Sequence, residues 1–213
     1  METLKLTIKD FGPDRYYTDR YYDGPVDVTD FDGNIEIDTG GDRCRFKTSV
    51  NASGYIKSSG ALYADGDIES GDYIESGGDI NSGGYIKATR GISSGCGISS
   101  VGYIKSFGDI KSIDYINSSG CDINSGGHIS SNGDIKAGDI HSGGHIISGG
   151  YIKSGGDINS GRYIFSADFV DSAGYIKSVG YVYTKGLVTC KKLTSGGVAS
   201  GKLVETTLVD QAC

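Results

Sequence analysis

An aliphatic residue recurs every six positions over most of this chain, and this period limits the possible folds more than any other feature. From Ile56 the series reaches Ile116 in steps of six residues. It then slips by one residue to Ile123, and a later five-residue step to Ile140 restores the original phase, which continues to Val188. A fixed short period of this kind is the sequence signature of a repeat architecture.

A small residue follows each aliphatic residue by two positions, as at Ser58, Ala64 and Ser70. Side chains alternate between the two sides of a strand, so the aliphatic and the small residue point inward together while their neighbours point outward. Gly-rich corners join one short strand to the next, and glycine suits a tight corner. We expect the inward serine hydroxyls to bond to corner backbone groups, which also accounts for a hydrophobic content of only 37%.

Strands of three or four residues cannot bury a core alone, but a coiled chain stacks them into parallel ladders. The sequence therefore predicts an all-β fold, a single-stranded parallel β-helix or β-solenoid. Three hexads give a triangular coil of about 18 residues, and two give a flattened coil of about 12. We favour the 18-residue coil because it places the outward aromatic residues of the later hexads on one face.

The two ends of the chain depart from the repeat, as expected where end coils must be capped. Residues 1–53 read as an N-terminal β cap or small subdomain, with alternation at Leu4, Leu6 and Ile8 and strand-like runs VDVTDF and NIEID. Residues 54–190 form the solenoid. Residues 191–213 read as a C-terminal cap or dimerisation segment, with apolar side chains at Leu203, Val204, Leu208 and Val209.

Composition favours a soluble cytoplasmic protein. No stretch approaches the roughly 18 apolar residues of a membrane span, and METLKLTIKDFG carries charges where a signal peptide is apolar. The net charge of −7 argues against direct nucleic-acid binding, but it leaves open an acidic surface that binds a basic groove on a partner. Five widely spaced cysteines without a CxxC pair favour reduced thiols over disulfides or a zinc site: Cys44, Cys96, Cys121, Cys190 and Cys213.

The repeat over residues 54–190 resembles several β-solenoid families in architecture. It shares its period with left-handed hexapeptide acyltransferases and is similar to bactofilin-type cytoskeletal solenoids, which polymerise end to end. In the acyltransferases the small inward residue lies two before the aliphatic, a place held here mostly by glycine, as at Gly60, Gly66, Gly78 and Gly84. This departure argues against acyl transfer. Pentapeptide-repeat proteins that imitate DNA offer a functional analogy.

No catalytic or metal site is predicted. GxGxxG matches are by-products of the Gly-rich corners. The three histidines, His128, His141 and His145, lie close together in the repeat. Only His128 and His145 occupy equivalent outward positions on successive coils, and the pattern specifies no third ligand beside them. We therefore expect no metal and no cofactor. Outward aspartates alternate with tyrosine in one slot, and no two of them stand out as an acid/base pair: Asp67, Asp79, Asp109, Asp122, Asp134, Asp139 and Asp157.

An outward aromatic patch on the later coils is the main binding candidate, because Tyr- and Phe-rich patches are enriched at interfaces. It is either an interface, self-association included, or a surface covered by a terminal segment of the same chain. We call it the aromatic patch, and on two adjoining faces it contains His145, Ile147, Tyr163, Phe165, Phe169, Tyr181, Tyr183 and Leu187.

The duplicated run DRYYTDRYYD is a second candidate, since tyrosine and arginine dominate binding hot spots. The alternative is a Tyr-rich edge strand packed on the first coil. Its candidate residues are Arg15, Tyr16, Tyr17, Arg20, Tyr21 and Tyr22. Stacked Tyr85/Lys87 and Tyr103/Lys105 could hold a nucleic-acid strand, but the acidic balance favours a solvated face.

These features lead to the hypothesis of a rigid, non-catalytic cytoplasmic protein that dimerises through the aromatic patch and engages or blocks a protein partner. By analogy, an inhibitor of nucleic-acid-handling defence machinery from a phage or mobile element fits this description. The alternative is an end-to-end polymerising scaffold of bactofilin type.

Overall fold

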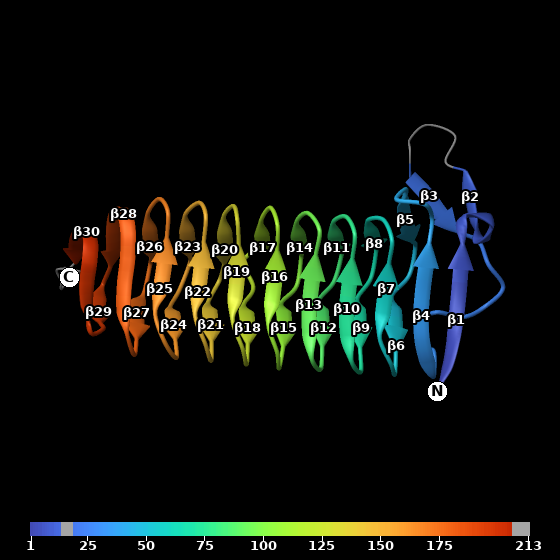
Figure 1. Ribbon diagram of the computed structural model, residues 1–213, viewed down its shortest axis with the longest axis horizontal. Helices are drawn as coiled ribbons and strands as arrows, with labels where there is room; N and C mark the ends of the chain where they lie inside the picture. The colour runs from blue at the N-terminus through green and yellow to red at the C-terminus, as the bar shows by residue number, and fades with distance from the viewer. Residues whose placement is uncertain (14–18, 206–213) are drawn as a thin grey trace, which may run out of the picture.

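The computed structural model describes residues 1–13 and 19–205. The chain winds into a rod in which strands of successive coils lie side by side, from the N-terminal coils to β30 at the opposite end (Figure 1). Ile56 pairs with Ile74, so equivalent residues are 18 apart. The predicted all-β parallel β-solenoid with an 18-residue coil is therefore confirmed.

Three ladders of strands, which we call faces A, B and C, run along the rod. Face A contains β1 (Glu2–Thr7), β4 (Gly33–Asp38), β7 (Ile56–Ser58), β10 (Tyr73–Ser76), β13 (Gly91–Ser94), β16 (Ile110–Ser112), β19 (Ile129–Ser131), β22 (Ile146–Ser148) and β25 (Ile164–Ser166). Face B contains β2 (Phe11–Pro13), β3 (Asp19–Tyr22), β5 (Arg43–Phe46), β8 (Leu62–Ala64), β11 (Ile80–Ser82), β14 (Ile98–Ser100), β17 (Ile116–Ser118), β20 (Ile135–Ala137), β23 (Ile152–Ser154) and β26 (Val170–Ser172). Face C contains β6 (Val50–Ala52), β9 (Ile68–Ser70), β12 (Ile86–Ala88), β15 (Ile104–Ser106), β18 (Ile123–Ser125), β21 (Ile140–Ser142), β24 (Ile158–Ser160), β27 (Tyr175–Ser178) and β29 (Lys192–Thr194).

Two long strands near the C-terminal end cross from face A to face B. In β28 (Tyr181–Cys190), Val182 pairs with β25 of face A and Val188 pairs with β26 of face B. The last strand, β30 (Gly197–Glu205), runs parallel to β28 and extends both ladders by one coil.

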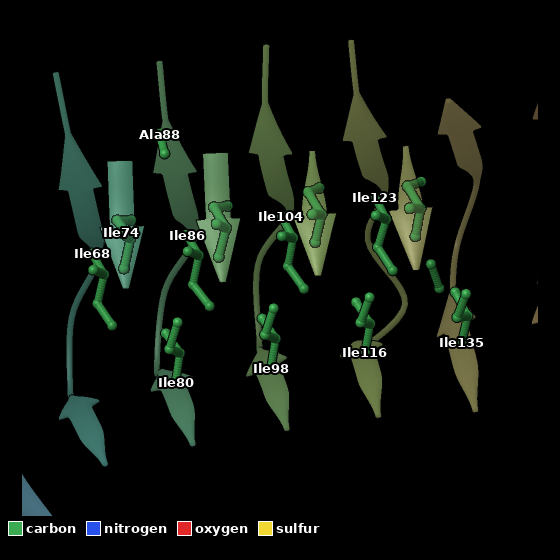
Figure 2. Packing of buried hydrophobic residues seen from close by; sticks show 14 of the residues in the cluster. Ile68, Ile74, Ile80, Ile86, Ala88, Ile98, Ile104, Ile116, Ile123 and Ile135 are labelled. Carbon is green, nitrogen blue, oxygen red and sulfur yellow. The ribbon is translucent and has the colours of Figure 1, made fainter. Parts of the chain in front are cut away.

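The interior of the rod is a stack of aliphatic side chains. Ile80 pairs with Ile98, which pairs with Ile116, and all three are fully buried. Figure 2 shows these isoleucines directed into the space between the faces. Full burial of one such side chain contributes about 1.5–3 kcal/mol, so the repeated column supplies the main stabilisation that a thin coil can obtain.

The inward serines satisfy the polar groups of the corners. Ser148 donates its hydroxyl to the carbonyl oxygens of Gly133 at 2.7 Å and Tyr151 at 3.0 Å, and it accepts the N–H of Gly150 at 3.2 Å. Ser94 makes the same set of contacts three coils earlier on face A. The predicted serine–corner hydrogen bonds are thus present, and they explain how a narrow interior tolerates buried hydroxyls.

The extra residue and the missing residue of the repeat fall at the same corner, between faces B and C, in successive coils. The longer corner connects β17 to β18 and places Gly120 at a φ of 86°. In the shorter corner, between β20 and β21, the Gly138 N–H donates to the Cys121 carbonyl at 2.6 Å. Because Ile123 still pairs with Ile140, the two irregularities cancel and the ladder is continuous.

The N-terminal residues extend the ladders of the repeat. Leu4 of β1 pairs with Ile35 of β4, which pairs with Ile56 of β7. Ile8 lies outside the expected alternation because it begins a short 3-10 helix, η1 (Ile8–Asp10). Beyond η1, β2 and β3 form the antiparallel pair at this end of face B.

The NIEID run forms β4 as expected, but VDVTDF does not form a strand. Asp27 Oδ1 accepts both the N–H of Thr29 at 2.8 Å and its hydroxyl at 2.6 Å. This local turn competes with ladder pairing. Only Phe31 of the run makes a bridge, to Ala52 of face C, among the residues that the structure describes.

No disulfide joins the cysteines in the described residues; Cys44 and Cys190 are buried, whereas Cys96 and Cys121 are exposed. Cys213, Leu208 and Val209 lie outside the described residues. Within residues 1–13 and 19–205, no helix has the length and apolar character needed to cross a membrane.

Candidate binding surface

The outward aspartates of the repeat cap the backbone of the next coil. Asp109 Oδ1 accepts the N–H of His128 at 2.8 Å, and Asp157 Oδ1 accepts the N–H of Tyr175 at 2.8 Å. Each accepting side chain and each donated N–H occupies the slot before the aliphatic residue, one coil apart. This arrangement gives the Asp residues of the slot a structural role that sequence reasoning missed. In the sequence, such a cap can be recognised by an Asp, Asn, Ser or His in the slot before the aliphatic residue.

Exposed charges pair along the ladders. Lys57 lies 3.4 Å from Glu75 and Lys153 lies 3.3 Å from Asp171, in each case one coil apart. Such exposed pairs contribute little stability individually.

The middle outward row of face A changes character along the rod. Near the N-terminal end it carries Lys57 and Glu75, which pair in register. Towards the C-terminal end Ile147 pairs with Phe165, which pairs with Tyr183. The structure therefore brings the face A members of the aromatic patch together over three successive coils.

Most of the aromatic patch is exposed, whereas its members His145, Ile147 and Phe169 are half-buried. Phe165 keeps 39% of its surface exposed and Tyr181 keeps 49%. On the same face the ring of Tyr163 lies 3.6 Å from that of His145 and 6.4 Å from that of Tyr183. On face B, Phe169 stacks on Tyr151 at 4.9 Å, and Leu187 is exposed in β28.

Two histidines at the edge of the patch accept backbone hydrogen bonds. His128 Nδ1 accepts the N–H of His145 at 2.9 Å, and His145 Nδ1 faces the N–H of Tyr163 at 3.4 Å. Their rings stack at 4.8 Å. Burial, followed by the nearby His128 and Arg162, lowers the pKa of His145. Both Nδ1 atoms are therefore occupied by the fold.

The third histidine lies elsewhere. His141 is on face C, where its Nδ1 lies 3.2 Å from the Asn159 amide. In residues 1–13 and 19–205, no three His, Cys, Asp or Glu side chains gather as metal ligands would.

The Tyr-rich N-terminal candidate is only partly described, because Arg15, Tyr16 and Tyr17 lie outside the described residues and Arg20 is placed by its backbone alone, in β3. Tyr21 and Tyr22 are described. The Tyr21 ring lies 5.0 Å from Lys47 Nζ. Tyr22 packs against Phe46 at 5.2 Å and is part of the aromatic cluster that covers the first coils.

The candidate nucleic-acid surface on face C is tied into local contacts. Tyr85 stacks on Tyr103 at 4.8 Å, and its hydroxyl donates to Glu69 at 2.7 Å. Lys87 pairs with the same carboxylate, which lowers the pKa of Glu69. Lys105 Nζ lies 5.8 Å from the ring of Phe107.

Sequence reasoning missed four apolar residues that protrude from the corners. They occupy the slot three residues after the aliphatic residue. In other hexads this slot mostly holds Gly or another small or polar residue, so a large apolar residue there is the sequence feature that could have revealed them. Val101, Phe107 and Ile113 follow three successive strands of one coil and are 60%, 67% and 60% exposed. The fourth is Val179, which precedes β28 and is 75% exposed.

The fold and its surface define this chain as a β-solenoid repeat protein. Compared with protein-family models, curated proteins and solved structures, it matches none of them.

Proposed function

We propose that this chain is a rigid, non-catalytic interaction protein of the cytoplasm that uses the aromatic patch to bind a protein. The observation that carries the proposal is the face A row in which Ile147, Phe165 and Tyr183 replace the charged residues of earlier coils. Exposed apolar patches rimmed by polar residues mark interaction sites. Tyr and Phe are also enriched in interfaces.

The roles of the polar residues support the non-catalytic part of the proposal. The Asp side chains of the pre-aliphatic slot accept backbone N–H groups, as Asp134 does from Tyr151 at 3.0 Å. The inward serines bond to corner backbone groups. These residue types are thus engaged in holding the coil, and a protein of this kind acts by occupying or blocking its partner. An inhibitor of nucleic-acid-handling machinery would work in this way.

A paired capture experiment tests the proposal. The chain, its Phe165→Ser/Tyr183→Ser variant and a Val101→Ser control are used as baits in a lysate of the source organism. Val101 is 60% exposed but lies at the corner between faces B and C, away from the aromatic patch. We expect the double variant to lose proteins that the chain and the control both retain, with unchanged β-rich circular dichroism. Retention of every captured protein would refute the proposal, and unfolding would make the patch internal packing.

An end-to-end scaffold is the second candidate, favoured by a face A ladder that runs without interruption from β1 to β30. In such a scaffold β30 of one copy would pair with β1 of the next. The antiparallel β2–β3 pair interrupts parallel addition on face B at the N-terminal end. Light scattering at rising concentration separates the candidates, because a scaffold grows without limit whereas an interaction protein reaches a fixed mass.

A further inference from the structure

We propose that the occupant of the aromatic patch is a second copy of this chain, packed face A to face A with the two rods parallel and in register. This inference rests on the proposed function, in which the patch binds a protein. In this dimer the two-fold axis runs along the rod, over the buried column that includes Ile110, Ile146 and Val182. Each coil then faces the same coil of the other copy, with its strand direction reversed.

Face A is flat enough for such packing. On face A, the stacked rings of Tyr55 and Tyr73 and of His128 and His145 are nearly parallel from one coil to the next, with an interplanar angle of 7° in both pairs. Coils therefore accumulate little twist, and outward rows stay straight along the rod. A second solenoid face presents the same spacing of ~4.8 Å, so its rows can match these rows over several coils.

The outward residues on the two sides of the buried column complement one another under this symmetry. Across the axis, the residue before the aliphatic residue in one copy meets the residue after it in the other. Tyr163 then meets Phe165 of the second copy, and His145 meets Ile147 of the second copy. The apolar and aromatic members of the patch on face A cover each other in reciprocal pairs, as an isologous interface requires.

The same operation accounts for two protruding corner residues that the patch alone leaves unexplained. Phe107 precedes β16 by three positions and Ile113 follows Ile110 by three, so they stand at opposite corners of one coil of face A. They are 67% and 60% exposed. Across the axis, Phe107 of each copy lies against Ile113 of the other. Between them, Asp109 and Lys111, 3.1 Å apart within one chain, meet the reversed pair of the second copy.

Charge selects the parallel orientation. Arg162 lies at the corner before β25 and Asp168 at the corner after it, and both are exposed. In the parallel dimer each Arg162 lies at the same edge of the interface as Asp168 of the other copy, which brings opposite charges near one another at both edges. In an antiparallel dimer centred on β25, Arg162 would instead face Arg162 and Asp168 would face Asp168. Like charges placed opposite one another disfavour that arrangement.

The size of the contact predicts a reversible dimer. From the coil of Ile110 to the coil of Val182 there are four steps of ~4.8 Å, so the contact extends over about 19 Å of the rod. One narrow face of that length buries less than the roughly 800 Å² per partner of a standard stable interface. Dimer and monomer should therefore exchange with concentration.

A charge-reversal set tests the inference by sedimentation equilibrium. Arg162→Glu or Asp168→Arg alone should each weaken dimerisation roughly tenfold, and the two together should restore it to within about threefold. Lys177→Glu, on face C, is the matched control and should leave dimerisation unchanged. The circular dichroism spectrum of each variant should match that of the unmodified chain, which checks that the solenoid is kept.

The outcomes separate this inference from the proposed function. A monomer at all concentrations, or a dimer that the combined variant does not restore, overturns the parallel dimer. If capture by the monomer still depends on Phe165 and Tyr183, the proposed function stands while this inference falls. A dimer that the Phe165→Ser/Tyr183→Ser variant leaves intact, together with unchanged capture, overturns both.

Discussion

Asp134 Oδ1 accepts the backbone N–H of Tyr151 at 3.0 Å, across the step from one coil to the next on face B. This N–H belongs to the residue just before the buried strand, where the ladder leaves it without a strand partner. The Asp side chain thus replaces a missing ladder bond. Asn34 does the same for Tyr55 at 3.1 Å near the start of face A.

Removing this cap should weaken the fold locally. We expect Asp134→Ala to lower the free energy of unfolding by about 1 kcal/mol, because one partly buried N–H loses its acceptor. Asp134→Asn keeps an acceptor oxygen and should lose less than half as much. Urea unfolding followed by circular dichroism measures both. Equal midpoints for Asp134→Ala and the unmodified chain would show that water replaces the carboxylate without cost.

The inward small slot should be more sensitive to volume than to hydroxyl loss. Ser148 is fully buried and makes three hydrogen bonds, yet Ala88 and Ala137 occupy the same slot elsewhere. We expect Ser148→Ala to cost about 1 kcal/mol. Ser148→Val adds volume to a filled coil and should cost about 1–3 kcal/mol more. The same unfolding midpoints rank the two variants, and a Val variant as stable as the Ala variant would reveal free space.

The period predicted the register because hydrophobic burial acts at every coil. An 18-residue coil follows once the outward rows of Ile147, Phe165 and Tyr183 are placed on one face, and the observed pairing agrees. The aspartate caps were not foreseen because donor and acceptor are a whole coil apart in sequence. Their partnership exists only after the coil length and the shape of the corners are fixed.

Local turns limited the prediction at the N-terminal end. VDVTDF alternates like a strand, but the Asp27 carboxylate binds Thr29 and holds a turn. Protruding corner residues such as Phe107 were overlooked because the core pattern does not depend on that slot. A binding surface is formed by outward positions whose residue type the fold does not constrain. The six-residue period therefore predicts little about which residues occupy them.

Acidification should weaken the coil around His145. In the folded chain the pKa of His145 is lowered, chiefly by burial and then by His128 and Arg162. In the unfolded chain the same histidine has its ordinary pKa of about 6.5. In the pH window between the folded pKa and about 6.5, the unfolded chain therefore binds more protons than the folded chain. Stability contributed by the neutral ring is therefore present above that pH and is lost as the pH falls through this window. Unfolding midpoints at pH 7.5 and pH 5.5 measure the loss.

The matched variant for this titration is His145→Asn. An Asn in the equivalent slot, Asn34, accepts the same type of backbone N–H without titrating. We expect the midpoint of the variant to change less between the two pH values than that of the unmodified chain. An identical pH dependence would assign the effect to groups other than His145.

Thiol reactivity should separate the cysteines by their place in the coil. Cys44 is fully buried, donates its Sγ–H to the Ala61 carbonyl at 3.0 Å, and has its pKa raised to about 11 by burial. The reactive species is the thiolate, so Cys44 is both inaccessible and protonated at neutral pH. Cys96 and Cys121 lie at exposed corners. With maleimide at pH 7.5, peptide mass spectrometry should find Cys96 and Cys121 labelled within minutes and Cys44 labelled only after denaturation. Rapid labelling of Cys44 in the folded chain would mean that the coil between β5 and β8 opens readily, which would contradict the rigid rod on which both the binding surface and the parallel dimer depend.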